Sequence, residues 1–274
     1  MSTTVVPVDD VVDALTREWA AIDDLVATLT DAQWQSPSIL PGWSVADIVA
    51  HIVGTENMLA GRDVDPTRDV AALDHVHNEI GELNEKWLDH FRGCPRSEVM
   101  DAFHEIIGVR TQALRAMSQD DFVAESFTPA GPDTYGRFMR IRIFDCWIHE
   151  IDIRDSVGRP GELDPAPTRW ALEEIAASLP FVIGKRARTP KGTSVLLRIG
   201  GVAPRDVRIT VQDRAALVES FPGGDDAADV TLTLDAADLA RLVGGRTSSV
   251  PERVTVIGDD AIGRAIVENF AYVI

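Results

Sequence analysis

The chain contains few cysteines, and their scarcity excludes one class of small secreted protein. Its 274 residues include two cysteines, Cys94 and Cys146, which form no CxxC pair. Two such residues provide no disulfide framework. Free thiols are typical of proteins in a reducing compartment, so the sequence predicts a cytoplasmic protein.

Long apolar runs and an excess of basic residues are also missing. No apolar run reaches the length of about 18 residues that a membrane-spanning helix needs, so we expect no membrane span. Residues 1–10 lack a basic start and an apolar core, which argues against a signal peptide. Acidic residues outnumber basic ones by 44 to 26, giving a net charge of −18. This balance argues against nucleic acid and anionic membrane surfaces as partners, and the acidity is most simply explained by solubility.

The first half of the chain has the apolar periodicity of helices. Apolar residues recur there at steps of three and four, and Ser44 is a good N-cap for the second helix. The predicted helices cover residues 11–29, 45–59, 70–92, 97–117 and 136–157. We therefore expect an all-α helical bundle over residues 8–158, which ends at Gly158.

The pattern changes after a linker at residues 158–167. Short alternating stretches are typical of strands in a mostly antiparallel sheet, and helical segments lie between them. The predicted strands are residues 194–199, 207–211, 230–234 and 254–257, and the predicted helices are residues 170–183, residues 236–242 and a terminal helix that opens at residues 258–260. The sequence thus predicts a two-domain protein whose second domain, residues 166–274, is α+β.

The fifth predicted helix carries a polar stripe. Asp145, His149, Asp152 and Ser156 fall on one face of it, and such a stripe either faces solvent or converges on a ligand. His51 lies in an apolar stretch of another helix, where a satisfied core histidine is the alternative explanation. Together, His51, Asp145 and His149 predict a half-open divalent metal site for Zn²⁺, Fe²⁺, Co²⁺ or Ni²⁺. Asp152 is a candidate to fix one imidazole tautomer.

These motifs resemble a known family. The residues that carry the resemblance are Trp34, Leu40-Pro41-Gly42-Trp43-Ser44-Val45, Asp47-Ile48-Val49, His51, Asp145, Trp147-Ile148-His149-Glu150, Asp152-Ile153-Arg154, Asp235, Asp238-Leu239, Leu242, Gly245-Arg246, Val254, Val256 and Gly258-Asp259. Along nearly the whole chain they resemble the mycothiol-dependent maleylpyruvate isomerase family. That family combines a DinB-like metal-binding four-helix bundle with a sterol-carrier-protein-like C-terminal domain.

The resemblance implies a set of functional residues. A zinc or similar divalent ion would be held by His51, Asp145 and His149, where the isomerase itself has a glutamate in place of the shorter Asp145. An arginine of the C-terminal domain would bind substrate carboxylates. Arg246 is the first candidate, with Arg253 and Arg241 behind it, and the alternative explanation of Arg246 is a cation at the end of a helix.

The resemblance also implies an activity. Mycothiol would serve as the thiol cosubstrate of a mycothiol-dependent isomerase or S-transferase that acts on a small electrophilic molecule. Metal coordination would deprotonate the thiol, so no protein cysteine need act as the nucleophile. The alternatives are a metal-dependent hydrolase-type enzyme that activates water, and a non-enzymatic binding module with a structural metal. The sequence is compatible with a monomer or a dimer.

Overall fold

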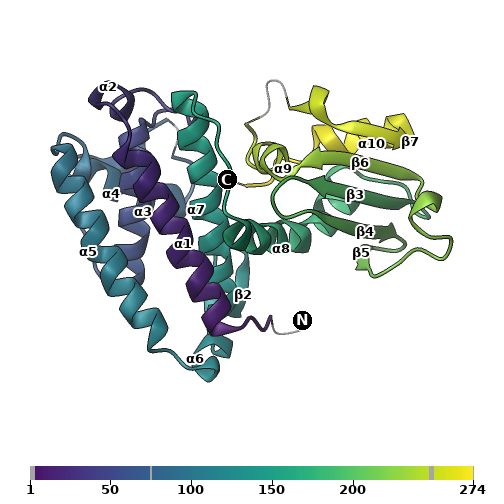
Figure 1. Ribbon diagram of the computed structural model, residues 1–274, viewed down its shortest axis with the longest axis horizontal. Coiled ribbons are helices and arrows are strands. Elements are labelled where there is room, and N and C mark those ends of the chain that lie inside the picture. Colours follow the sequence, from purple (N-terminus) through teal and green to yellow (C-terminus); the bar gives the residue numbers. More distant parts are fainter. Residues whose placement is uncertain (1–3, 75, 247–249, 274) are drawn as a thin grey trace. The chain divides into compact units, whose positions relative to one another are not determined.

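The computed structural model describes residues 4–74, 76–246 and 250–273, and the chain divides into two compact units, Met1–Gly161 and Glu162–Ile274. The first unit is helical and the second contains a sheet with flanking helices (Figure 1). The prediction of an all-α N-terminal part followed by an α+β C-terminal part is therefore confirmed.

The elements of the first unit are α1 (Val8–Ala27), α2 (Asp31–Trp34), α3 (Val45–Leu59), the 3₁₀ helix η1 (Val70–Ala72), α4 (Glu79–Phe91), α5 (Arg96–Arg115), α6 (Gln119–Val123), β1 (Glu125–Thr128), β2 (Gly131–Thr134) and α7 (Tyr135–Val157). Helices α1 and α3 each pack against both α5 and α7, which gives a closed ring of four helices. Leu15, Trp19 and Ile22, one turn apart on α1, are almost completely buried, because residues at this spacing share one face. The four-helix bundle follows from such apolar stripes.

The predicted helix over residues 70–92 is wrong in its first half. Only η1 and α4 are helical there, and Leu73 between them has an extended backbone, with ψ of 135°. Asn78 is the N-cap of α4, and its side chain accepts a hydrogen bond from the backbone N–H of Gly81 at 2.8 Å. The short polar side chain thus starts a new helix where apolar periodicity predicted continuity.

Four small elements of this unit were missed. The helices α2 and α6 span four and five residues, too few to show a periodic pattern. The antiparallel strands β1 and β2, in which Glu125 pairs with Thr134, are equally short, with four residues each. Gly131 has φ of 97°, a conformation that glycine adopts without strain.

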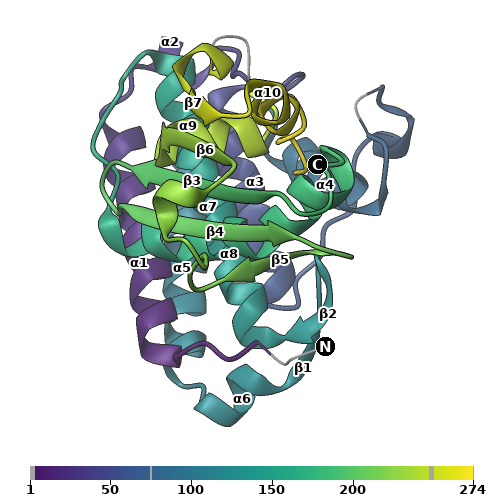
Figure 2. The ribbon, with the colours of Figure 1, turned by 90° about the vertical axis from the view of Figure 1, so that its right-hand side faces the viewer.

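The elements of the second unit are α8 (Pro165–Phe181), the π-helical turn η2 (Val182–Arg186), β3 (Ser194–Gly200), β4 (Arg205–Val211), β5 (Ala215–Val218), η3 (Asp225–Ala227), β6 (Val230–Asp235), α9 (Ala236–Val243), η4 (Pro251–Arg253), β7 (Thr255–Gly258) and α10 (Asp260–Glu268). The five strands lie in the order β5-β4-β3-β6-β7, as Figure 2 shows. The β3–β6 pair is parallel and the other three pairs are antiparallel, so the sheet is mostly antiparallel, as predicted.

The start of one helix and the presence of one strand in this unit were not predicted correctly. Helix α8 begins at Pro165, inside the predicted linker, because Asp164 caps it and proline is well suited to the first helical turn. The short edge strand β5 was missed, since a four-residue strand carries little alternation.

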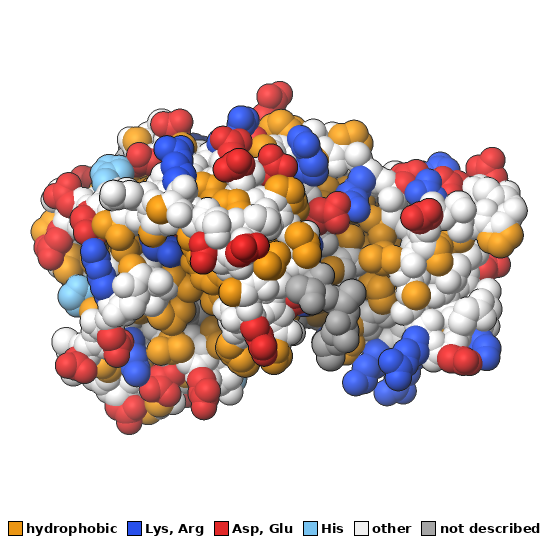
Figure 3. Space-filling view, turned by 90° about the horizontal axis from the view of Figure 1, so that it is seen from below, with side chains coloured by type: hydrophobic (Ala, Val, Ile, Leu, Met, Phe, Trp, Pro, Cys, Tyr) orange, Lys and Arg blue, Asp and Glu red, His pale blue; other side chains and the backbone are white. Residues whose placement is uncertain are grey.

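No helix among the described residues is long and apolar enough to cross a bilayer. On the face of the molecule shown in Figure 3, acidic side chains are scattered among basic ones. The visible negative charge is therefore distributed over the surface.

The contact between α3 and α4 depends on Gly54. A Cβ atom added to Gly54 would lie 2.4 Å from both Cβ and Cγ of Trp87. Gly54→Ala should therefore lower the free energy of unfolding by about 1–3 kcal/mol, measured by urea denaturation. Gly108→Ala on α5 is the matched control, since no atom lies within 4 Å of its added Cβ, and it should raise stability by about 0.5–1 kcal/mol. Equal stabilities of the two variants would contradict this packing argument.

Candidate metal centre

The first candidate ligand, His51, is placed by the start of α3. Ser44 and Asp47 form a capping box: the Ser44 hydroxyl accepts from the Asp47 backbone N–H at 3.1 Å, and Asp47 Oδ2 accepts from the Ser44 N–H at 2.8 Å. The box fixes where the helix begins. His51 follows two turns later among the fully buried Ile48 and Ile52, and it is itself buried.

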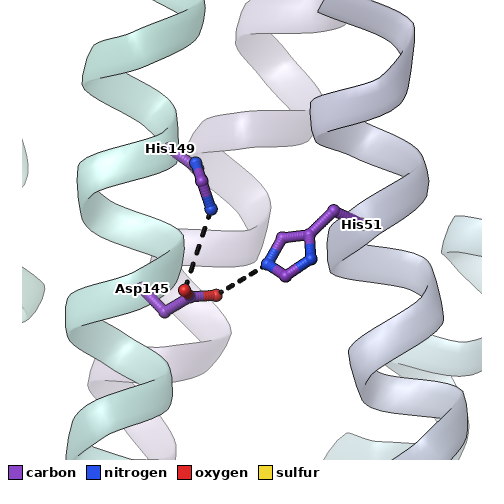
Figure 4. A group of neighbouring side chains, drawn as sticks. All are labelled: His51, Asp145 and His149. Atoms are coloured by element: carbon purple, nitrogen blue, oxygen red, sulfur yellow. Dashed lines mark hydrogen bonds and ion pairs between the residues drawn. The ribbon is translucent and has the colours of Figure 1, made fainter. Parts of the chain in front are cut away.

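The other two candidate ligands lie on α7. This helix of 23 residues begins at the N-cap Thr134 and ends at Gly158, whose φ of 63° closes it in the left-handed conformation. Asp145 and His149 are four residues apart and therefore share a face. Figure 4 shows both side chains directed toward His51 on α3. The helical spacing thus brings two potential ligands together, and the α3–α7 contact adds the third.

The distances between the three groups fit a metal site. His51 Nε2 lies 3.2 Å from Asp145 Oδ2, and His149 Nε2 lies 3.7 Å from Asp145 Oδ1. One ligand atom from each residue can be chosen so that all lie within 4.8 Å of one another. Ligands around a tetrahedral Zn²⁺, with bonds of about 2.0–2.2 Å, are separated by about 3.3–3.6 Å. Two imidazole nitrogens and one carboxylate oxygen also form a donor set that suits such ions.

The tautomer of His149 is set by Asp152. His149 Nδ1 lies 3.0 Å from Asp152 Oδ2, and both residues are buried. Because an ionised carboxylate only accepts hydrogen bonds, Nδ1 carries the proton and the Nε2 lone pair is left to face Asp145. The Nδ1 atom of His51, by contrast, is buried and has no hydrogen-bond partner among the described residues. The two imidazoles are therefore held in different ways.

The electrostatic environment favours the protonation states that ligands need. Burial lowers the pKa of His51 below its ordinary value, although the nearby Asp145 opposes this effect, so the neutral ring is favoured. Burial alone would raise the pKa of Asp145, but the Arg142 guanidinium and the two imidazoles outweigh it and hold the pKa well below the usual range. A neutral imidazole and an ionised carboxylate are the forms that bind a cation.

The neighbouring thiol is unsuited to nucleophilic chemistry. Cys146 is fully buried, and burial raises the pKa of its thiol well above the ordinary value. Its sulfur lies 3.6 Å from Arg142 Nη2. A buried thiol that stays protonated is a packing group rather than a nucleophile, so Cys146 is not a candidate for the reacting thiol.

Sequence reasoning missed one aromatic neighbour of the site. The ring of Trp43 lies 5.3 Å from the ring of His51 and 6.2 Å from that of His149, measured between centroids. The indole N–H donates to Glu85 Oε1 at 2.9 Å, and Glu85 is buried. Trp43 therefore forms one wall of the candidate centre. It occurs in the first motif, but nothing in its spacing indicates contact with both histidines.

Arg246 belongs to the second unit, so it is not in the same compact unit as the three candidate ligands. Its guanidinium donates to the carbonyl of Gly244, just after α9 ends. Arg241 and Arg253 both bind Asp238, through Arg241 Nη1 at 2.8 Å and Arg253 Nε at 2.9 Å. Arg241 and Arg253 therefore form a structural ion-pair cluster with Asp238.

Both parts of the chain match models of known protein families. Residues 15–154 match the family described as the mycothiol maleylpyruvate isomerase N-terminal domain, and residues 169–262 match the MDMPI C-terminal domain. The two matches lie within the two structural units. Proteins from two strains of Mycobacterium tuberculosis, both described as uncharacterised, are 24% identical over 255 residues, which is 88% of this chain and 86% of each relative.

Two solved structures have the same fold. The crystal structure of the mycothiol-dependent maleylpyruvate isomerase superposes with a TM-score of 0.59, and a histidine-to-alanine mutant of that protein superposes with 0.57. Each alignment covers 92% of this chain and 95% of the other, at 16% identity. With matches that span most of both units, the chain belongs to the mycothiol maleylpyruvate isomerase family.

Proposed function

We propose that the protein is a metal-dependent enzyme that activates a low-molecular-weight thiol, mycothiol, for reaction with a small electrophilic substrate. The observation that carries the proposal is the convergence of His51, Asp145 and His149 from two helices within ligand-binding range. Membership of the mycothiol maleylpyruvate isomerase family supports the choice of thiol.

The side chains of the centre have distinct roles in this proposal. His51 and His149 would hold the cation as neutral imidazoles, and Asp145 would supply the negative charge. Asp152 keeps the proton of His149 on Nδ1, at a distance of 3.0 Å. Trp43 covers one side of the histidine pair and limits the access of water from that side. Zinc is the first candidate ion, and Fe²⁺, Co²⁺ and Ni²⁺ suit the same donors.

Three protein ligands leave a coordination position for an incoming group. A bound divalent cation would lower the pKa of a coordinated thiol, so that the sulfur could react at neutral pH. The Asp145 side chain is 30% exposed while those of His51 and His149 are 6% and 8% exposed, so the carboxylate is the most accessible of the three groups. We infer that the cosubstrate approaches beside Asp145.

The substrate class follows from the chemistry of a thiol. Sulfur adds to an electrophilic double bond, and rotation about the resulting single bond followed by elimination of the thiol changes cis to trans geometry without changing composition. If the adduct persists, the outcome is thiol transfer. Arg246 would bind a substrate carboxylate through two parallel hydrogen bonds, which a guanidinium provides better than an ammonium. Isomerisation is favoured by family membership.

Removal of either histidine tests the metal centre. His51→Ala and His149→Ala should each lose bound metal, because two remaining ligands hold a divalent ion poorly, and elemental analysis of the purified variants measures this. His104→Ala is the control, since His104 is exposed and pairs with Asp23 on the bundle surface. Stoichiometric metal in both ligand variants would defeat the assignment.

Removal of the metal tests the chemistry. Protein stripped with a chelator should lose mycothiol-dependent isomerisation of maleylpyruvate, followed by absorbance, and should regain it when Zn²⁺ or Co²⁺ is added. Turnover of electrophilic or hydrolysable substrates without any thiol would favour water activation instead. If stripping lowers the melting temperature and neither thiol nor water chemistry is found, the metal is structural and the protein is a binding module.

Substitution of Arg246 tests the carboxylate site. Arg246→Ala should raise KM for a carboxylate substrate by about tenfold or more, because a hydrogen bond to a charged group contributes about 1.5–3 kcal/mol. Metal content should stay at the parent value. Arg264→Ala is the control, since Arg264 is exposed and pairs with Asp260 on α10. Unchanged kcat/KM in the Arg246 variant would remove this residue from the site.

A further inference from the structure

A buried arginine contacts the candidate carboxylate ligand from the side of the bundle core. Arg142 lies one turn before Asp145 on α7, and its side chain is 3% exposed. Its Nη1 atom donates to Asp145 Oδ2, its Nε donates to Glu56 Oε1 at 3.0 Å, and its Nη2 lies 3.6 Å from Cys146 Sγ. All three guanidinium nitrogens are therefore engaged, and the group has a fixed orientation.

Glu56, the carboxylate that binds Arg142, is also bound by a second arginine. Glu56 on α3 is fully buried, and its second oxygen, Oε2, accepts from Arg110 Nε on α5 at 2.9 Å. Arg110 is 4% exposed and also donates to the Tyr135 hydroxyl at 3.1 Å. Two arginines and two carboxylates thus alternate through the core from α5 to Asp145. Each buried charge has an opposite partner, as burial requires.

We propose that Arg142 is a positioning residue that holds the Asp145 carboxylate in the orientation needed for metal binding, and that Glu56 and Arg110 fix Arg142 for this task. The proposal rests on the metal centre proposed above. Neither Arg142 nor Glu56 is one of the three candidate ligands. Their effect on the metal would act through the oxygen atoms of Asp145.

The need for such a group follows from the geometry of an aspartate. The Asp145 carboxylate can rotate about its side-chain bonds, and its 30% exposure leaves it less confined than the two buried imidazoles. The contact with Arg142 is made by Oδ2, which also lies 3.2 Å from His51 Nε2. This contact turns Oδ1 toward His149. Partners that orient a metal-binding carboxylate typically change metal affinity by about 10–100-fold when they are removed.

Arg142→Lys tests the orientation of the Asp145 carboxylate separately from the positive charge at position 142. The substitution keeps the positive charge beside the cation, but a single ammonium cannot reproduce the planar fork that spans Glu56 and Asp145. Metal-free protein is titrated with Co²⁺, and the visible absorption spectrum reports both affinity and coordination geometry. We expect the dissociation constant for Co²⁺ to rise by about tenfold or more and the spectrum to change.

Arg154→Lys is the matched control on the same helix. Arg154 donates to the buried Glu150 at 2.7 Å and is itself 19% exposed, so it forms a partly buried ion pair with a residue that is not a candidate ligand. This variant should bind Co²⁺ within about threefold of the parent and give the parent spectrum. If Arg142→Lys does not fold, Glu56→Gln provides the same test, since it keeps both arginines and weakens the ion pairs that Glu56 makes with them, including the one that fixes Arg142.

The outcomes separate the two proposals. A parent protein that binds no Co²⁺ would defeat the metal centre itself. A parent that binds Co²⁺, together with a folded Arg142→Lys or Glu56→Gln variant of equal affinity and unchanged spectrum, would overturn only the positioning role. Loss of affinity in Arg154→Lys to the same extent would also overturn it, because any disturbed ion pair on α7 would then have the same effect.

Discussion

The carboxylate of Asp145 is the group on which the organisation of the helical unit depends. It lies within 3.7 Å of an imidazole nitrogen on α3 and of another on its own helix, and it also binds Arg142. A carboxylate in this position keeps its charge only because positive and hydrogen-bonding groups outweigh the effect of burial on its pKa. The contact between α3 and α7 therefore includes a polar cluster, and this cluster is the metal centre that we propose.

Such a core has a cost in stability. Buried ion pairs rarely stabilise a protein more than apolar residues of the same size would, because both charges lose their hydration. Glu56, Arg110 and Arg142 occupy positions that Leu or Met could fill in a bundle of this kind. Their presence is explained if they specify the position of one functional group, since a rigid network orients a side chain more strictly than apolar packing does. Function and stability thus make opposite demands on the same helices.

The sequence predicted the class of the fold, and it singled out three side chains that lie together, but it did not predict most of what surrounds them. The spacing of Asp145 and His149 and the apolar setting of His51 are local patterns, and the structure brings these three side chains together. The 3.0 Å contact between His149 and Asp152 follows from the same helical spacing. The link from Glu56 to Arg142 joins residues 86 positions apart, and no periodicity within one helix indicates which buried charges will meet. The break at Leu73 was also missed. The apolar pattern predicted one continuous helix, whereas the Asn78 cap starts a new helix.

The length of the Asp145 side chain affects how this residue can contact Arg142. An aspartate reaches about one methylene less than a glutamate, so on a rigid helix it can bring its oxygens to a given point from fewer directions. Asp145 nevertheless places Oδ2 3.2 Å from His51 Nε2. The short side chain leaves its carboxylate close to the backbone of α7, where Arg142, one turn earlier on the same face, can reach it. In the proposed centre, the short acid and the buried arginine would together determine how the carboxylate is oriented.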